Sequence, residues 1–277
     1  MKKLILINGQ GQEYDLLKID KSPTFQVDGF GYVDSTPFMQ IGSNFHPLEE
    51  TIAQGAINLK ILLWKNADKD YKDFVSHCRH APLTMLYGDT VGEFYYPCKL
   101  KSIEKTEKVG VNIRGASVEF ALTGNPYKII SVYNDGVSVD GKKYSFTYPY
   151  VYANDMRNIV RIQSDSYLHS PVRLTIYGNT VNPIWRHYCN GNLVETGAYA
   201  GTIPAGNRLV IDAKAVPFSI VEYDYADNVV ADRYGKCDYS TERFMHAYEG
   251  VNQYVIAQDS FEAVRLKVEA YIEYETV

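Results

Sequence analysis

The sequence predicts a mainly β protein with two domains and a single helix. Short apolar segments with period-two alternation recur along most of the chain, and Gly, Asn, Asp and Pro separate them, as in antiparallel strands joined by tight turns. Tyrosine is unusually abundant, with 24 Tyr against 11 Phe and 2 Trp, and its large ring suits half-buried pleated surfaces and protein interfaces. The length of 277 residues suffices for two ordinary domains, each with its own core.

The stretch from Ser170 to Ala213 shows the β pattern most clearly. Apolar residues alternate at positions 172, 174 and 176, and a second extended segment covers residues 184–188. An Asn-Gly turn follows at Asn190, and a closing strand from Arg208 to Asp212 is entered through a Pro-Ala-Gly turn. This succession predicts a sandwich of two sheets and contains nothing typical of a catalyst.

The N-terminal half is predicted to be strand after strand, interrupted by one helix from Asp68 to His80. Asp68 is the expected N-cap, the apolar residues at 71, 74, 75 and 78 form one stripe, and Pro82 ends the helix. A helix this short needs tertiary support, so the stripe should pack against the sheet. The predicted strands of this half are 4–7, 14–19, 25–27, 38–41, 56–64, 83–87, 93–100 and 116–122.

The strand pattern breaks at Gly124-Asn-Pro126, and this break is the predicted domain boundary. The first domain then covers residues 1–127 and the second covers residues 128–277. Asn-Asp-Gly and Asp-Gly turns begin a new β region directly after the break, so the linker is short or absent. Later strands are expected near residues 159–162, 219–224 and 263–271.

The composition indicates a soluble globular protein, with 45% hydrophobic and 22% charged residues and a net charge of -5. A mildly acidic balance argues against a nucleic-acid binder that grips phosphates. The opening MKKLILINGQ has too short an apolar region for a signal peptide, and no apolar run reaches the length of a membrane span. We therefore expect a chain that stays in the cytoplasm or leaves the cell by a route other than secretion.

The cysteines and histidines indicate no metal site. The four cysteines show neither CxxC pairing nor the density of a disulfide scaffold, and we interpret them as buried thiols. His77, Cys78 and His80 form the one local cluster of potential ligands. On a helix, however, Cys78 lies on the apolar stripe, away from the two histidines, so the three converge poorly on one metal. The cysteines are Cys78, Cys98, Cys189 and Cys237.

No enzyme motif appears in the chain: there is no GxSxG, HExxH, phosphate loop or GxGxxG. The acids Glu222, Asp224 and Asp227 cluster in sequence, but acids on a strand and its turn are expected to be a solvated face. The sequence therefore predicts no catalytic residue, no metal ligand and no cofactor.

Two series of motifs resemble the distal tail proteins of siphophages that infect Gram-positive bacteria. The first series has YxDF in the helix, a Tyr95-Tyr96 pair, the run SIEKTE from Ser102, and an Asn-Pro-Tyr exit at Asn125. The second resembles the galectin-like domain of the same family, with a strand from Pro171 to Gly178, an Asn-Pro turn at residues 182–183, and a strand over residues 206–212. The motifs keep the family's order over nearly the whole chain.

This resemblance implies a structural role in the virion of a phage or prophage with a non-contractile tail. Residues 1–127 would form a β-sandwich or split-barrel domain that assembles a hexameric ring, and residues 128–277 a galectin-like jelly-roll sandwich. The ring would be the hub, or baseplate centre, at the tail tip. It would join the tail-tube (major tail) protein to the tail-associated lysin or tail fibre protein, and would dock receptor-binding or baseplate proteins. DNA would pass through the channel without specific binding. The implied location is the virion tail tip after synthesis in the bacterial host cytoplasm, with no membrane insertion.

The N-terminal hairpin is the expected contact between subunits, because an open sheet edge is a natural pairing site. It would complete a neighbour's sheet, with Leu4, Leu6, Tyr14 and Leu16 at the interface.

The alternative function is a carbohydrate-binding module for adhesion to the host cell surface, in which exposed aromatic residues lie over a sheet face. Trp185, Tyr188 and Tyr199 are the candidate carbohydrate-binding residues. Trp185 and Tyr188 are three residues apart, so on one strand they point to opposite faces and cannot form one platform.

Overall fold

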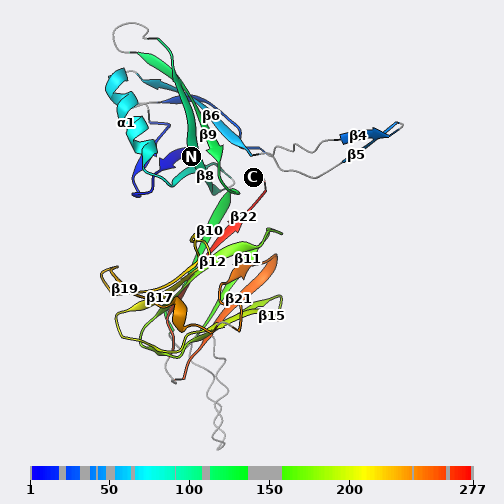
Figure 1. The fold of residues 1–277 in the computed structure, drawn as a ribbon, viewed down its shortest axis with the longest axis vertical. Helices are drawn as coiled ribbons and strands as arrows, with labels where there is room; N and C mark the ends of the chain where they lie inside the picture. Colours follow the sequence, from blue (N-terminus) through cyan, green and yellow to red (C-terminus); the bar gives the residue numbers. More distant parts are fainter. Residues whose placement is uncertain are drawn as a thin grey trace, which may run out of the picture. The chain divides into compact units, whose positions relative to one another are not determined.

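The structure is a computed structural model that describes residues 2–18, 23–31, 38–41, 43–47, 54–63, 66–90, 92–107, 113–136, 158–238, 240–259 and 263–275. The predicted mainly β architecture is confirmed, and the chain divides into two compact units (Figure 1). Unit 1 comprises residues 1–128 and 274–277, and unit 2 comprises residues 129–273. The sequence assigned residues 274–277 to the second domain instead. Tyr274 packs within unit 1, where its ring lies edge-on to Phe94 at 5.8 Å and its N–H donates to the Pro126 carbonyl.

Unit 1 contains an antiparallel sheet in the strand order β2-β1-β7-β8-β9-β6-β3. A separate hairpin of β4 and β5 and one helix, α1, complete the described elements of this unit. The bounds are β1 (Lys3–Ile7), β2 (Glu13–Asp15), β3 (Thr24–Asp28), β4 (Phe38–Ile41), β5 (Asn44–Pro47), β6 (Ala56–Leu63), α1 (Ala67–Arg79), β7 (Leu83–Gly88), β8 (Glu93–Lys105) and β9 (Arg114–Leu122).

The long strand β8 joins the two halves of this sheet. Its 13 residues are about twice the mean length of a strand. The first half pairs with β7 and the second half with β9, so that Cys98 is opposite Leu83 on one side and Leu122 on the other. The register with β9 shifts between Leu100 and Ser102, as at a β-bulge, which bends a strand. One bent strand thus holds both half-sheets around a common core.

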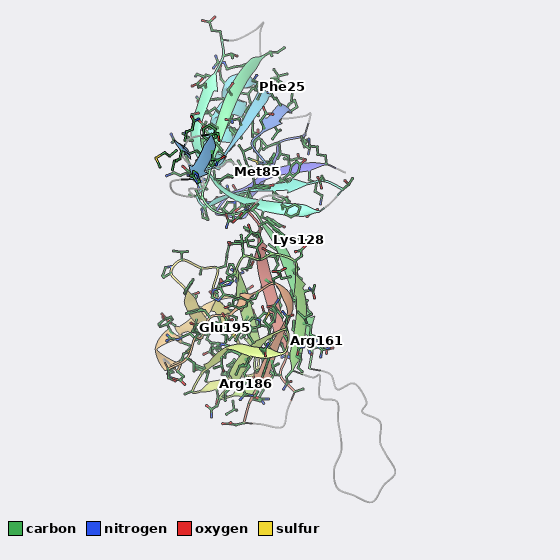
Figure 2. All side chains as sticks on the ribbon, turned by 90° about the vertical axis from the view of Figure 1, so that its right-hand side faces the viewer. Phe25, Met85, Lys128, Arg161, Arg186 and Glu195 are labelled. Atoms are coloured by element: carbon green, nitrogen blue, oxygen red, sulfur yellow. The ribbon has the colours of Figure 1, made fainter. Side chains whose placement is uncertain are left out.

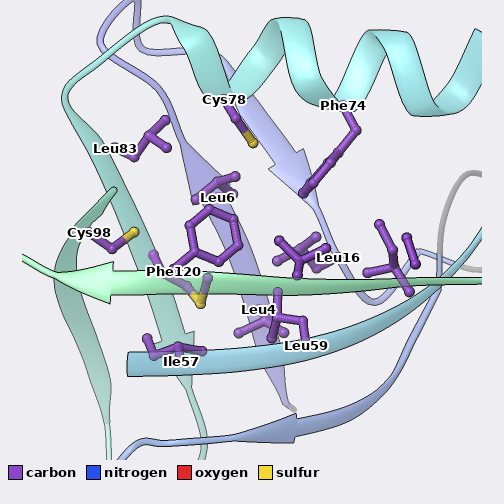
Figure 3. Packing of buried hydrophobic residues seen from close by; sticks show 14 of the residues in the cluster. Leu4, Leu6, Leu16, Ile57, Leu59, Phe74, Cys78, Leu83, Cys98 and Phe120 are labelled. Carbon is purple, nitrogen blue, oxygen red and sulfur yellow. The ribbon is translucent and has the colours of Figure 1, made fainter. Parts of the chain in front are cut away.

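Helix α1 covers that core (Figure 3). Phe74 and Cys78, both predicted for the apolar stripe, are buried among leucines of β1 and phenylalanine and isoleucine side chains of β6 and β9. The helix begins at Ala67, and the cap is Asn66, whose side chain accepts a hydrogen bond from the Lys69 N–H at 3.3 Å. The prediction of Asp68 as the cap was therefore wrong by two positions. An asparagine caps as well as an aspartate, and Asp68 instead places its charge in the first turn.

Unit 2 is built from two antiparallel sheets, as expected for a sandwich. In the first sheet the order is β10-β22-β12-β17-β18-β19, and in the second it is β11-β21-β14-β15. Alternate residues of the strands fill the space between the sheets, as the burial of every second residue in β11 and β22 shows. The bounds are β10 (Tyr127–Asn134), which starts in unit 1, β11 (Ile159–Ser164), β12 (Ser170–Tyr177), β14 (Ile184–Cys189), β15 (Asn192–Ala198), β17 (Arg208–Asp212), β18 (Ser219–Tyr223), β19 (Val229–Asp232), β21 (Gly250–Ala257) and β22 (Leu266–Glu273). Short pieces are β13 (Thr180–Val181), β16 (Thr202–Ile203), β20 (His246–Ala247) and the 3₁₀ turn η1 (Tyr234–Lys236).

The four cysteines are free thiols. Cys78, Cys98 and Cys237 are buried as expected, whereas Cys189 is half-buried. Burial raises the pKa of Cys78 and of Cys98 to about 12 and that of Cys237 to about 11. These three thiols therefore stay protonated at neutral pH. Among the residues described, no helix is both long enough and apolar enough to cross a membrane.

Truncation of the buried Phe120 ring tests the position of the core of unit 1. Phe120 is fully buried, whereas Phe25 on β3 is 66% exposed. We expect Phe120→Ala to lower the free energy of unfolding by about 3–5 kcal/mol, because it removes buried apolar contacts and leaves a cavity. Phe25→Ala, the matched control, should change it by no more than about 0.5 kcal/mol. Denaturant unfolding of both variants measures this, and equal effects would contradict the described core.

Candidate interaction surfaces

The hairpin of β4 and β5 exposes all of its described side chains. Phe38, Met39, Ile41 and Phe45 are between 46% and 66% exposed. A lone two-stranded hairpin is at best marginally stable in water, and its described residues bury no side chain in either unit. Four large apolar side chains gathered on such a hairpin mark a surface for contact with another molecule.

The register of the hairpin separates its side chains into two faces. Phe38 is opposite Pro47, and Gln40 is opposite Phe45, so both phenylalanines lie on one face. Met39 and Ile41 lie on the other face. The described hairpin residues include no Asp, Glu, Lys or Arg. Each face thus carries two large apolar side chains, beside Gln40 on one face and Asn44 and His46 on the other, and the described hairpin residues lack the charges that oppose pairing of β edges.

Unit 1 also has two terminal strands, β2 and β3, each paired on one side among the residues described. Glu13 and Asp15 flank β2, and edge charges of this kind oppose pairing with a further strand. Strand β3, TFQVD, carries the exposed Phe25 and has a single acid at its end (Figure 2). Of the two edge strands, β3 is therefore the better suited to pair with an uncharged strand.

The structure does not place the expected subunit-interface leucines at the surface. Leu4, Leu6 and Leu16 are fully buried in the core of unit 1, and Tyr14 is half-buried with its ring edge-on to Phe74 at 5.3 Å. The reason is that β1 lies inside the sheet, between β2 and β7, so its alternating leucines face the core of its own domain. The N-terminal hairpin is therefore a folding element, and the expectation of interface contacts by these leucines is corrected.

The proposed carbohydrate-binding aromatics do not come together at the surface either. Trp185 and Tyr199 are 1% and 2% exposed, and Tyr188 is half-buried. The Trp185 indole N–H donates to the Arg243 carbonyl at 2.9 Å. The ring also lies so close to Gly197 that a Cβ there would be 2.5 Å from it. Trp185 and Tyr199 are thus core residues with no face left for a sugar ring.

A buried ionic cluster lies in unit 2 around Glu195, whose position is labelled in Figure 2. One carboxylate oxygen of Glu195 is 3.0 Å from His187 Nδ1, and the other is 2.8 Å from His246 Nδ1. The Tyr248 hydroxyl donates to the second oxygen as well, at 3.0 Å. The cluster joins β14, β15 and β20, and sequence reasoning missed it. One available signal was the spacing of His187 from Trp185, which puts both on the inward face of β14.

Hydrogen bonds orient the side chains of this cluster and shift the pKa values of Glu195 and His246. His187 Nε2 is 2.9 Å from the Asn252 Oδ1, and Asn252 is oriented by donating its amide to the Tyr248 carbonyl at 2.7 Å. Both ring nitrogens of His187 therefore have a hydrogen-bond partner inside the core. Burial alone would raise the pKa of Glu195, but hydrogen bonds from His187 and His246 outweigh it and lower the pKa to about 2. The hydrogen bond to Glu195 raises the pKa of His246.

The acids considered above for catalysis have structural partners. Glu222 is buried, which corrects its assignment to a solvated face, and it pairs with Arg233 at 2.6 Å. Asp224 holds the following turn through the Ala226 and Asn228 N–H groups. Asp227 forms an ion pair with Arg208.

His77, one of the potential ligands set aside in the sequence analysis, has a structural partner too. His77 contacts the Leu6 carbonyl through Nε2 at 3.0 Å, which ties α1 to β1. Within the described ranges, no group of three or more His, Cys, Asp or Glu could hold a metal ion.

The fold defines a class: a mainly β protein with an N-terminal antiparallel sheet domain, an exposed apolar hairpin and a C-terminal sandwich. Residues 3–123 match the model of the distal tail protein N-terminal domain. The resemblance to this phage tail family stated from the sequence is thus confirmed over residues 3–123. A search of the curated proteins finds no match.

Two solved structures share the fold of the whole chain. A chain of the phage P2 baseplate in its activated conformation is similar with a TM-score of 0.72 and 15% identity, over 100% of both chains. The SPP1 Dit protein, described as a paradigm of the hub adsorption apparatus in phages that infect Gram-positive bacteria, is similar with a TM-score of 0.60 and 8% identity, over 96% of this chain and 98% of that one. At these identities the likeness shows the fold.

Neutralising Glu195 tests the buried cluster. Glu195→Gln should lower the free energy of unfolding of unit 2 by about 3–5 kcal/mol, because it removes the buried carboxylate that His187, His246 and Tyr248 share as a hydrogen-bond partner. Glu249→Gln, at an exposed position next to Tyr248 in the sequence, is the matched control and should change this free energy little.

The same cluster predicts a pH dependence of stability. The pKa of Glu195 is lowered, so its contribution is present above pH 4.5 and is lost as the pH falls toward 2. The pKa of His246 is raised, so its contribution is present below pH 6.5 and is lost as the pH rises through the raised value. Urea unfolding of the wild type and Glu195→Gln across this range measures both limbs. Curves with the same pH dependence would contradict the cluster.

Proposed function

We propose that this chain is the structural hub at the distal end of a non-contractile phage tail. Six copies would form a ring through unit 1, with one face on the tail-tube protein and the other on the tail-associated lysin or fibre, and with receptor-binding or baseplate proteins docked outside. The observation that carries this proposal is a hairpin with four large exposed apolar side chains and no Asp, Glu, Lys or Arg among its described residues, next to a sheet that matches the distal tail family model.

The hairpin supplies a contact between copies in this proposal. One copy would lay β4 and β5 against the free edge of β3 in the next copy, where Phe25 provides an exposed apolar neighbour for Phe38 and Phe45. The hairpin and β3 are different surfaces of one domain, so the contact is heterologous. Repeated heterologous contacts close into a ring when the rotation between copies permits it. The number six comes from the family resemblance.

The charge balance of the chain fits a channel for DNA. A net charge of -5 gives no excess of cations with which to hold phosphates, so DNA would pass without specific binding. A strongly positive lumen in an assembled ring would contradict this part of the proposal.

The solution mass of the full-length chain tests the hub. We expect light scattering to give a mass near six chains at high protein concentration, and negative-stain images of the same fraction to show rings. A monomer at every accessible concentration, without rings on a tail-tube template, would overturn the proposal.

Polar substitution of the hairpin tests how the ring is held. Phe38→Ser with Phe45→Ser should raise the protein concentration at which half the rings dissociate by at least tenfold, because each interface loses two aromatic anchors. Both residues are exposed, so the free energy of unfolding should be almost unchanged. The matched control is Leu193→Ser with Val194→Ser, two exposed apolar residues of β15 in unit 2.

Light scattering over a dilution series compares these variants. Equal dissociation of the wild type and the hairpin variant would show that the ring is held elsewhere.

A further inference from the structure

The outward face of the first sheet of unit 2 carries a hollow of about 320 Å³. The face is formed by β22, β12, β17 and β18, whose opposite side is the core. The register arranges the outward residues in three rows across the strands. The first row is Glu269, Arg173, Asp212 and Ser219; the middle row is Lys267, Thr175, Val210 and Val221; the third row is Tyr177, Arg208 and Tyr223.

The sizes of these side chains explain the hollow. The middle row has three short side chains in succession, Thr175, Val210 and Val221, while long side chains stand in the rows on both sides. The outer rows are four residues apart along each strand, or about 14 Å, and the four strands span about the same distance. The result is a trough that runs across the strands, with a floor of methyl groups and walls of guanidinium, carboxylate and phenol groups.

The first wall is fixed before any ligand arrives. Arg173 donates from Nε to Asp212 Oδ2 at 2.8 Å and pairs with the same oxygen through Nη2 at 2.7 Å. The other oxygen of Asp212 accepts the Lys214 N–H at 2.8 Å, so the carboxylate is itself oriented by the backbone. These contacts use two of the five N–H donors of the guanidinium. Side chains locked in this way lose little entropy on binding.

The third row, which forms the opposite wall of the trough, is also held by contacts within the chain. Arg208 pairs with Asp227, donates to the Asp224 carbonyl at 3.1 Å, and lies 5.4 Å from the centre of the Tyr223 ring. Tyr177 stands on the other side of Arg208, and its ring meets Tyr133 edge-on at 5.8 Å. Two tyrosines and one arginine therefore form an ordered row beside the apolar floor.

We propose that this trough binds a neutral saccharide of one or two pyranose rings. A pyranose has a C–H face that suits methyl groups and tyrosine rings, and a rim of hydroxyls that suits fixed guanidinium and carboxylate groups. The lining has three cations, Arg173, Arg208 and Lys267, against two acids, and each of the three is paired with an acid. Such paired charges attract a lone anion weakly and serve well as hydrogen-bond partners.

The composition of the lining also favours a saccharide over a protein as the ligand of the trough. Protein interfaces centre on buried apolar or aromatic anchors, whereas the floor here has two valines and a threonine below walls of charged groups. The hollow is close to the lower end of the volume range of small-molecule sites. The predicted sugar residues Trp185 and Tyr199 take no part, since they lie in the core.

The test measures binding to the full-length chain in whatever oligomeric state it adopts, so it is independent of the hub proposal. The probes are methyl pyranosides and disaccharides of glucose, galactose, rhamnose and N-acetylglucosamine, with a glycerol phosphate trimer as the anionic probe. Saturation-transfer NMR finds the binders and calorimetry gives the affinity. Val210→Phe fills the floor, Tyr177→Ala removes part of a wall, and Val194→Phe, an exposed valine of the other sheet, is the control.

We expect saturable binding of at least one neutral saccharide, little affected by 0.5 M salt. Val210→Phe and Tyr177→Ala should weaken it at least tenfold, and Val194→Phe should leave it unchanged. The use of two variants guards against one that fails to fold, which the unfolding midpoint of each reveals. The proposal is overturned if no neutral probe saturates, if only glycerol phosphate binds and salt abolishes it, or if both trough variants bind like the wild type.

Discussion

The shared pairing of strand β8 is the constraint on which unit 1 depends. Cys98 lies opposite Leu83 of β7 and Leu122 of β9, so the two half-sheets meet at this strand. Phe94 and Tyr96 of the same strand enter the core beside the leucines of β1. With β1 held inside the sheet, the terminal positions go to β2 and β3, and the apolar hairpin stays outside the core. The surfaces used in the proposed ring contact thus follow from how the core is closed.

Unit 2 differs from unit 1 in that both faces of its first sheet carry polar groups with partners. Glu222 of β18 is buried on the inner face, where Arg233 and Asn207 satisfy its carboxylate. On the outer face of the same sheet, Arg173 is held by Asp212. Paired charges of this kind keep side chains in one orientation, which is what a surface needs if it is to recognise a partner. The candidate interaction surfaces of the chain are thus the apolar hairpin of unit 1 and the outer face of the first sheet of unit 2.

The fold class could be predicted because alternation and turn residues are local signals. The predicted strands over residues 4–7, 56–64 and 208–212 follow from spacing alone and correspond to β1, β6 and β17, and so does the helix stripe at Phe74 and Cys78. Whether each of these residues is buried in its own domain or exposed could not be predicted from spacing. Leu4 and Leu6 alternate in the same way whether they face their own core or a neighbour, and the pairing of β1 with β7 decides between these.

The candidate surfaces were harder to predict for the same reason. Residues 38–41 were expected to form a strand, but their exposure depends on the tertiary structure. Glu195 and Glu222 carry charges that usually lie at the surface, and only contacts with residues 8 to 53 positions away in sequence show that they are paired inside. The trough joins residues from four strands between positions 173 and 269, so no local pattern contains it.

Hydrogen exchange at the backbone amides of β4 and β5 tests most directly whether the hairpin is docked on another copy. The account predicts that these amides are protected at concentrations where the chain assembles and exchange rapidly after dilution to the monomer, while amides of β1 and β6 stay protected in both states. Rapid exchange of β4 and β5 in the assembled protein would contradict it, because a docked hairpin cannot leave its amides open to water.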